Sequence, residues 1–415
     1  METLLCISVA IAAGLLLSRF VKPLKLPAVT GYLIAGILVG PYCLGALGVP
    51  GLGFNSMEQL EELSILSNVA LGFIAFAIGN EFRLEDLKKN GKQATVIGIV
   101  QALVAALLVD GALIAFHLIA PDKLSLPAAI TLGAIATATA PAATLMVVRQ
   151  YKAKGPLTDL LLPIVALDDA VGLIVFAVSF GIARALIEGK VDMISVIVNP
   201  VVEIVASLLL GALMGLLFSV CEKFFNSNSK RLTLAITFVM LTVGLSMLHF
   251  EIGPVTVGFS SLLVCMMLGT IFCNICDFSA EIMEKTDKWT APLFVLFFVM
   301  SGAELELSVF SDVIIVAIGA IYILSRSAGK IAGAAGSAKL MKCSPTTVKY
   351  LGITLLPQAG VALGMTITAM SLGADGVLIR NIVLFAVLIY ELVGPALTRI
   401  ALTKAGDITP RQVTK

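Results

Sequence analysis

Apolar segments long enough to cross a bilayer recur along almost the whole chain. Hydrophobic residues make up 59% of the 415 residues and charged residues only 13%, about half the charged share of a soluble protein. Such a chain cannot cover a surface in water, so a soluble globular enzyme is excluded. Thirteen membrane spans are expected, at residues 4–18, 28–46, 60–79, 93–118, 125–148, 157–183, 195–221, 232–249, 254–273, 289–303, 310–338, 350–371 and 377–398.

The composition and these spans predict one all-α, polytopic membrane domain over residues 1–415, with no separate soluble domain. Basic residues support the number of spans. Of the 28 Lys and Arg residues, 22 fall in alternate loops on one side of the expected membrane. One span too many or too few would invert every later loop, and the basic residues would then be spread over both sides. Because positive charge favours the cytoplasmic side, the N-terminus is expected outside and the C-terminus in the cytoplasm, in the plasma (inner) membrane of a prokaryote.

An odd number of spans allows two six-helix halves in opposite orientation around a linking seventh, the arrangement of inverted-repeat transporters. The fifth and twelfth spans, which correspond in the two halves, each contain a proline. Pro141 interrupts the fifth, and Pro357 interrupts the twelfth with Gly360 close behind it. Two discontinuous helices that cross at a midplane binding site are expected. Ordinary proline kinks are the alternative.

Two adjacent acids, Asp168 and Asp169, lie about 16 Å into a span that crosses about 30 Å of hydrocarbon. Each costs about 2.5–3.5 kcal/mol there, so something must compensate. A bound cation does so directly, and a proton does so when the cation is absent, because desolvation disfavours a charged carboxylate. Competition between cation and proton for one site is the chemistry of exchange. A purely structural hydrogen-bonding role is the alternative.

Four further residues are candidates for the same site. Lys330 and Arg326 are four residues apart, hence on one helix face, and either could pair with Asp168. A static salt bridge is the alternative for both. Thr137 and Thr139 precede Pro141 and offer oxygen ligands, beside carbonyls that a broken helix would free. Simple packing against the preceding helical turn is their alternative.

The sequence contains no phosphate-binding loop, no HExxH zinc motif, no Ser/His/Asp spacing and no basic-aromatic nucleic-acid motif. Transport driven by ATP, a catalytic activity, a bound cofactor and nucleic-acid binding are therefore not expected.

Six segments, in this order, resemble the cation/proton antiporter superfamily of sodium/proton exchangers: VTGYLIAGILVGP, GNEFRLEDLKKNG, TATAPAATLMV, ALDDAVGLIVFA, FFVMSGAELELSVF and RSAGKIAGAAGSAKL. Paired aspartates resemble its electrogenic branch, whereas the electroneutral branch has Asn where Asp168 stands. Arg326 matches an arginine of electroneutral relatives, so the partner of Asp168 stays open between Lys330 and Arg326.

The resemblance implies a homodimer in which a core moves against a dimerisation scaffold to give alternating access. The core is expected at 60–183 and 289–398, and the scaffold at 1–50 and 195–273. By matching positions, Asp169 would bind the ion, Asp168 would exchange a salt bridge with Lys330 for ion binding, and Thr137 and Thr139 would lie at the helix crossing.

The expected function is secondary antiport of Na⁺ for H⁺, electrogenic, with Li⁺ or K⁺ as alternative cations. The expected partners are thus monovalent cations, protons and the lipid bilayer. A K⁺/H⁺ antiporter is the second candidate within transport. A gated cation channel, or a membrane sensor whose aspartates merely bind an ion, is the candidate from another class.

Overall fold

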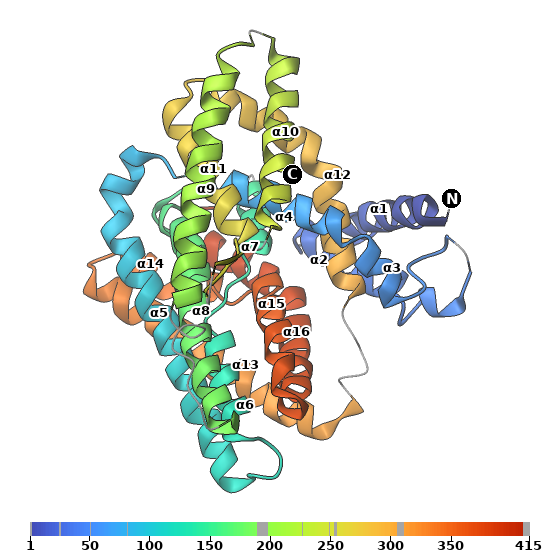
Figure 1. Cartoon of the computed structure of the whole chain (residues 1–415), viewed down its shortest axis with the longest axis vertical. Coiled ribbons are helices and arrows are strands. Elements are labelled where there is room, and N and C mark those ends of the chain that lie inside the picture. Colours follow the sequence, from blue (N-terminus) through green and yellow to red (C-terminus); the bar gives the residue numbers. More distant parts are fainter. Residues whose placement is uncertain are drawn as a thin grey trace. The chain divides into compact units, whose positions relative to one another are not determined.

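A computed structural model describes residues 2–24, 26–49, 51–80, 82–188, 198–225, 227–248, 250–252, 255–304 and 311–409 (Figure 1). Each expected span overlaps at least one helix, and the all-α prediction is confirmed. The helices are α1 (Glu2–Val21), α2 (Ala28–Val39), η1 (Gly45–Leu47), α3 (Met57–Glu62), α4 (Ser64–Gly79), α5 (Leu84–Ile119), α6 (Leu126–Ile135), α7 (Pro141–Gln150), α8 (Pro156–Glu188), α9 (Asn199–Glu222), α10 (Asn228–Ser246), α11 (Ser261–Ile275), α12 (Ser279–Ala303), α13 (Val313–Leu340), α14 (Pro345–Thr354), α15 (Gly360–Ala369), η4 (Met370–Leu372) and α16 (Ala374–Ala405).

Seven helical segments in the described ranges are long and apolar enough to span a membrane: Thr3–Val21, Gly91–Ile119, Pro156–Ile187, Val201–Glu222, Ser229–Ser246, Val313–Leu340 and Ala374–Ala405. Shorter apolar helices accompany them, among them α2, α4, α6 and α11. In a bilayer a helix satisfies its own backbone hydrogen bonds, which explains why the apolar segments take this form.

One small sheet interrupts the helical pattern. Strands β1 (Phe250–Ile252) and β2 (Val255–Val257) pair antiparallel, with Glu251 opposite Thr256. The expected span at 254–273 therefore begins too early. Its first residues are rich in β-branched side chains, which favour extended backbone, and α11 starts only after Ser260, whose hydroxyl accepts a hydrogen bond from the Leu263 amide.

The chain divides into two compact units. Unit 1 comprises residues 1–20, 31–89 and 198–304. Within it α11 packs against α4 and α9, and small residues let the helices approach closely. A Cβ on Gly79 would lie 1.9 Å from the Met266 carbonyl oxygen, and one on Gly269 would lie 2.2 Å from that of Phe76. Glycine at these places permits the backbone-to-backbone packing typical of membrane helices.

Unit 2 comprises residues 21–30, 90–197 and 305–415. Within it α13 packs against α5 through Gly329 and Gly333, where an added Cβ would lie 2.6 Å from the Cα of Ala105 and 2.8 Å from the Cα of Gln101. Residues 60–89 and 289–304 belong to unit 1, whereas the expected core at 60–183 and 289–398 included them. The assignment of core and scaffold roles stays a prediction.

Two helices of unit 2 are broken, and the breaks meet. Helix α6 ends at Ile135 and α7 begins at Pro141, which stands at the first helical position, where its missing N–H is harmless. Helix α14 ends at Thr354 and α15 begins at Gly360, with Pro357 between them. The Ala140 amide donates to the Pro357 carbonyl oxygen at 2.8 Å. The extended segments therefore contact each other through their backbones.

Arg326 satisfies carbonyl groups that the breaks leave without helical partners. Its guanidinium donates to the carbonyl oxygens of Ala136 at 3.0 Å, Leu356 at 2.7 Å and Ala138 at 2.6 Å. It also lies 4.6 Å from the centre of the Tyr390 ring. A cation at the carboxyl ends of helices is favourable, so this buried arginine on α13 ties together both broken helices.

Asp407, just after α16, caps the start of α8. Its Oδ2 accepts hydrogen bonds from the Thr158 amide and hydroxyl, both at 2.7 Å, and its carbonyl oxygen accepts from the Lys154 amide at 2.9 Å. Gly155 precedes α8 and has no side chain with which to cap it. A distant carboxylate therefore takes the place of the usual capping residue, where negative charge is favourable.

Arg326→Lys is expected to lower the free energy of unfolding by at least about 2 kcal/mol, because one ammonium cannot replace three guanidinium contacts. The melting temperature of the purified protein in detergent measures this. Arg380→Lys, at an exposed arginine of the same unit, is the control and should change stability by less than about 0.5 kcal/mol. Equal melting temperatures for the two variants would contradict the proposed role of Arg326.

Asp407→Ala is expected to lower the free energy of unfolding by about 1–3 kcal/mol, since it leaves the buried Thr158 donors unpaired. The same thermal measurement tests it. Lys288→Ala is the control, because its ion pair with Glu284 is exposed and such pairs contribute about 0–1 kcal/mol. An unchanged melting temperature for Asp407→Ala would show that the cap adds no stability.

Candidate ion-binding site

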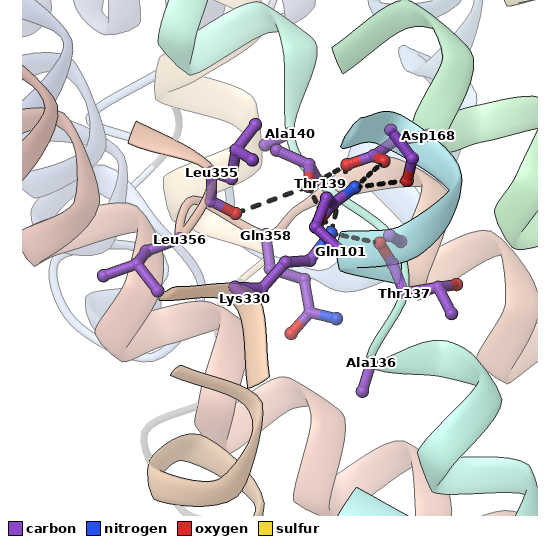
Figure 2. Close-up of polar contacts among 12 residues, drawn as sticks. Gln101, Ala136, Thr137, Thr139, Ala140, Asp168, Lys330, Leu355, Leu356 and Gln358 are labelled. Atoms are coloured by element: carbon purple, nitrogen blue, oxygen red, sulfur yellow. Dashed lines mark hydrogen bonds and ion pairs between the residues drawn. The ribbon is translucent and has the colours of Figure 1, made fainter. Parts of the chain in front are cut away.

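The candidate site lies in unit 2, where α8 passes the two helix breaks (Figure 2). Asp168 is on α8, and its side chain is 0% exposed. The extended segments on either side of Thr139 and of Leu356 face it, and the side chain of Lys330 reaches it from α13.

The Asp168 carboxylate accepts hydrogen bonds from three side chains. Its Oδ2 accepts from the Thr139 hydroxyl at 2.6 Å and from the Lys330 ammonium at 3.0 Å. Its Oδ1 accepts from the Gln101 amide nitrogen. All three neighbours donate, which suits the acceptor-only character of an ionised carboxylate.

Lys330 is the basic residue that pairs with Asp168. Its ammonium also donates to the Thr137 carbonyl oxygen at 2.6 Å and to the Thr139 hydroxyl oxygen at 2.9 Å, and its side chain is completely buried. Arg326, the other sequence candidate, faces the carbonyl groups described above. Between the two candidates, the geometry of the described residues favours Lys330.

The two threonines take different positions. The Thr139 hydroxyl lies between Asp168 and Lys330. The Thr137 hydroxyl donates back to the Ala134 carbonyl at 2.7 Å, so the helix break offers the Thr137 main-chain oxygen to the site. This carbonyl is not used in a helix, because α6 has already ended two residues earlier.

Gln101 on α5 is a site residue that the sequence interpretation missed. It is completely buried, and its amide nitrogen donates to the Gly98 carbonyl at 2.9 Å as well as to Asp168. The signal was present: an amide side chain stands within the apolar segment at 93–118. Nothing in the sequence, however, indicates contact with a residue 67 positions later.

Gln358 and Tyr322 form a second polar group beside the breaks. The Gln358 amide nitrogen donates to the Ile135 carbonyl and to the Tyr322 hydroxyl, both at 2.9 Å. This group closes the end of α6 and supports the backbone from which Thr137 and Thr139 project.

The remaining predicted residues line the breaks or fall outside the description. Pro141 begins α7, Pro357 lies in the second break and Gly360 begins α15. Asp169 follows Asp168 in α8, but its side chain lies outside the described residues. Its predicted part in ion binding stays a prediction.

The site presents oxygen atoms of the kind that a dehydrated monovalent cation binds: a carboxylate, a hydroxyl and a main-chain carbonyl. No cluster of three or more His, Cys, Asp or Glu side chains suited to a metal ion occurs among the described residues. Asp168, the one carboxylate of the site among the described residues, matches a single positive charge. Lys330 now supplies that charge, and a cation at Asp168 would have to replace it.

Known transporters resemble this chain in sequence. A family model described as "Sodium/hydrogen exchanger, transmembrane" matches residues 7–404. The Na⁺/H⁺ antiporter NhaS4 of Synechocystis sp. is 26% identical over 353 residues, which cover 83% of each protein. The cation/H⁺ antiporter 19 of Arabidopsis thaliana is 38% identical over 84 residues, 20% of this chain and 10% of that protein.

A solved structure shares the fold. The sodium proton antiporter MjNhaP1 from Methanocaldococcus jannaschii at pH 8 superposes with a TM-score of 0.66 at 18% identity, over 100% of this chain and 99% of that one. The resemblance inferred from six sequence segments is therefore confirmed, and the chain belongs to the sodium/hydrogen exchanger family of transmembrane cation/proton antiporters.

Proposed function

We propose that this antiporter exchanges Na⁺ for H⁺ by alternating access, and that the pairing of Asp168 with Lys330 is the switch of the cycle. The observation that carries the proposal is the 3.0 Å contact between these two completely buried charges, at the place where the helix breaks meet. Of the relatives, NhaS4 is named a Na⁺/H⁺ antiporter and the Arabidopsis relative a cation/H⁺ antiporter.

In the proposed cycle, a cation that reaches Asp168 takes over the carboxylate from Lys330. The lysine then releases its proton, because its carboxylate partner is now bound to the cation and a buried ammonium without a partner is poorly solvated. Asp169 releases another proton when it joins the cation. Two protons exchange for one Na⁺, so one net charge moves per cycle and transport is electrogenic.

Alternating access requires one part of the molecule to move while another stays fixed. We assign the moving core to unit 2, which contains Asp168, Lys330 and both broken helices. Unit 1 serves as the scaffold in a homodimer. The proposed core is therefore smaller than the core expected from the sequence, because it leaves out residues 60–89 and 289–304. The basic residues of alternate loops support an N-terminus outside and a C-terminus in the cytoplasm of a prokaryotic plasma membrane.

Asp168→Asn is expected to slow cation-coupled proton movement in proteoliposomes by at least about 100-fold, because a neutral amide loses about 3 kcal/mol of attraction for the bound cation. Proton movement across vesicles with a fixed pH gradient is followed after addition of Na⁺, Li⁺ or K⁺ in parallel. Asp122→Asn, at an exposed aspartate in the α5–α6 connection, makes the same chemical change away from the site and should transport normally.

Three outcomes would contradict the proposal. Wild-type turnover in Asp168→Asn would remove Asp168 from the mechanism. Cation currents without proton movement would indicate a channel. Coupling to K⁺ alone would make the protein a K⁺/H⁺ antiporter.

Electrogenic exchange predicts that the membrane potential limits the rate. In vesicles with equal K⁺ on both sides, valinomycin clamps the potential near zero and should speed Na⁺-driven proton movement several-fold, since each elementary charge moved against 100 mV costs about 2.3 kcal/mol. A rate unaffected by valinomycin would instead indicate electroneutral exchange of one proton for one cation.

A further inference from the structure

We propose that the side-chain oxygen of Gln101 is a cation ligand of the Asp168 site and helps to select among monovalent cations. The inference rests on the proposed antiport function and extends it to a residue on α5, a helix that carries none of the sequence-predicted site residues. Hydrogen bonding, burial and charge at Gln101 each support it.

Hydrogen bonding fixes the orientation of the Gln101 amide. An amide nitrogen donates and an amide oxygen accepts. One end of this side chain lies between two acceptors, the Gly98 carbonyl oxygen and Asp168 Oδ1. That end must be the nitrogen, so the other end is the oxygen Oε1.

The Oε1 atom is buried and has no hydrogen-bond partner among the described residues, although Gln101 as a whole is 0% exposed. Leaving a buried acceptor unpaired is unfavourable. Gln358 provides a contrast in the same unit, because its Oε1 accepts from the Tyr322 hydroxyl at 3.3 Å and its nitrogen is also paired. Of the two buried glutamine amides beside the helix breaks, the oxygen of Gln358 is thus paired and that of Gln101 is not.

A monovalent cation at Asp168 would satisfy this oxygen. A half-turn about the last side-chain bond would exchange the two ends of the amide. Oε1 would then take the place of the nitrogen beside Asp168 Oδ1 and the Gly98 carbonyl, and a cation bound there would replace the two hydrogen bonds that the nitrogen gives up. A neutral amide oxygen adds a hard ligand without adding charge. The charge of the site is unchanged, and the number and strength of such dipoles influence which cation is preferred.

The test compares Gln101→Met with Gln93→Met in proteoliposomes. Methionine keeps the unbranched shape and removes both polar atoms. Gln93 lies on the same helix, where its amide donates to the Met341 carbonyl at 3.1 Å, and serves as the control. The apparent KM is measured for Na⁺, Li⁺ and K⁺ separately at one pH gradient, with melting temperature and size-exclusion profile recorded for each variant.

For a lost ligand we expect Gln101→Met to raise the KM of the transported cation about tenfold and to change the ratio of KM values between cations. Gln93→Met should keep both. A fall in maximal rate with unchanged KM ratios would show that Gln101 only supports the structure, and would overturn the inference. If Gln101→Met does not give a monodisperse protein, Gln101→Asn, which retracts the amide by one methylene, is measured against the same two expectations.

Failure of this inference is distinguishable from failure of the proposed function. If wild-type protein shows no cation-coupled proton movement, the antiport proposal fails, and the inference fails with it. If wild-type protein exchanges cations for protons and Gln101→Met keeps the wild-type KM values, only the role of Gln101 is rejected.

Discussion

A charged carboxylate inside a bilayer must be compensated, and much of unit 2 follows from that requirement. Burying an ion costs several kcal/mol even after relaxation, and a single opposite charge seldom repays it without further hydrogen bonds. Asp168 therefore accepts hydrogen bonds from Lys330, Thr139 and Gln101 together. Bringing a lysine from α13 to this point requires α13 to approach α5 closely, which explains Gly329 and Gly333 at their contact.

The helix breaks follow from the same requirement. A continuous helix uses its own carbonyl groups and offers none to a ligand, whereas interrupting α6–α7 frees the Thr137 carbonyl for the Lys330 ammonium. Further freed carbonyls need a permanent donor, which Arg326 supplies. Arg326 and Lys330, one turn apart, thus have different roles. The guanidinium of Arg326 cannot lose its proton and binds backbone carbonyl groups. The ammonium of Lys330 can lose its proton and faces the carboxylate.

Sequence patterns predicted those parts of the molecule that depend on local composition. Hydropathy located the helices, Pro141 and Pro357 marked the breaks, and the adjacent acids in an apolar segment singled out Asp168. Contacts between distant residues left no such trace. The carbonyl contacts of Arg326 and the approach of Gln101 to Asp168 depend on how helices pack, as does the membership of residues 60–89 in unit 1. Strands β1 and β2 were missed because a short β-branched segment also fits the end of an apolar span.

The closed pair of Asp168 and Lys330 has a consequence for exchange. The Asp168 carboxylate pairs with one positive charge at a time, so a cation that binds it leaves a protonated Lys330 buried without its partner in a medium of low dielectric constant. Binding of one must expel the other or its proton. A site that were permanently closed would gain as much from two apolar residues of similar size. On the proposed function, the pair persists because it can open, and each opening couples the entry of a cation to the departure of protons.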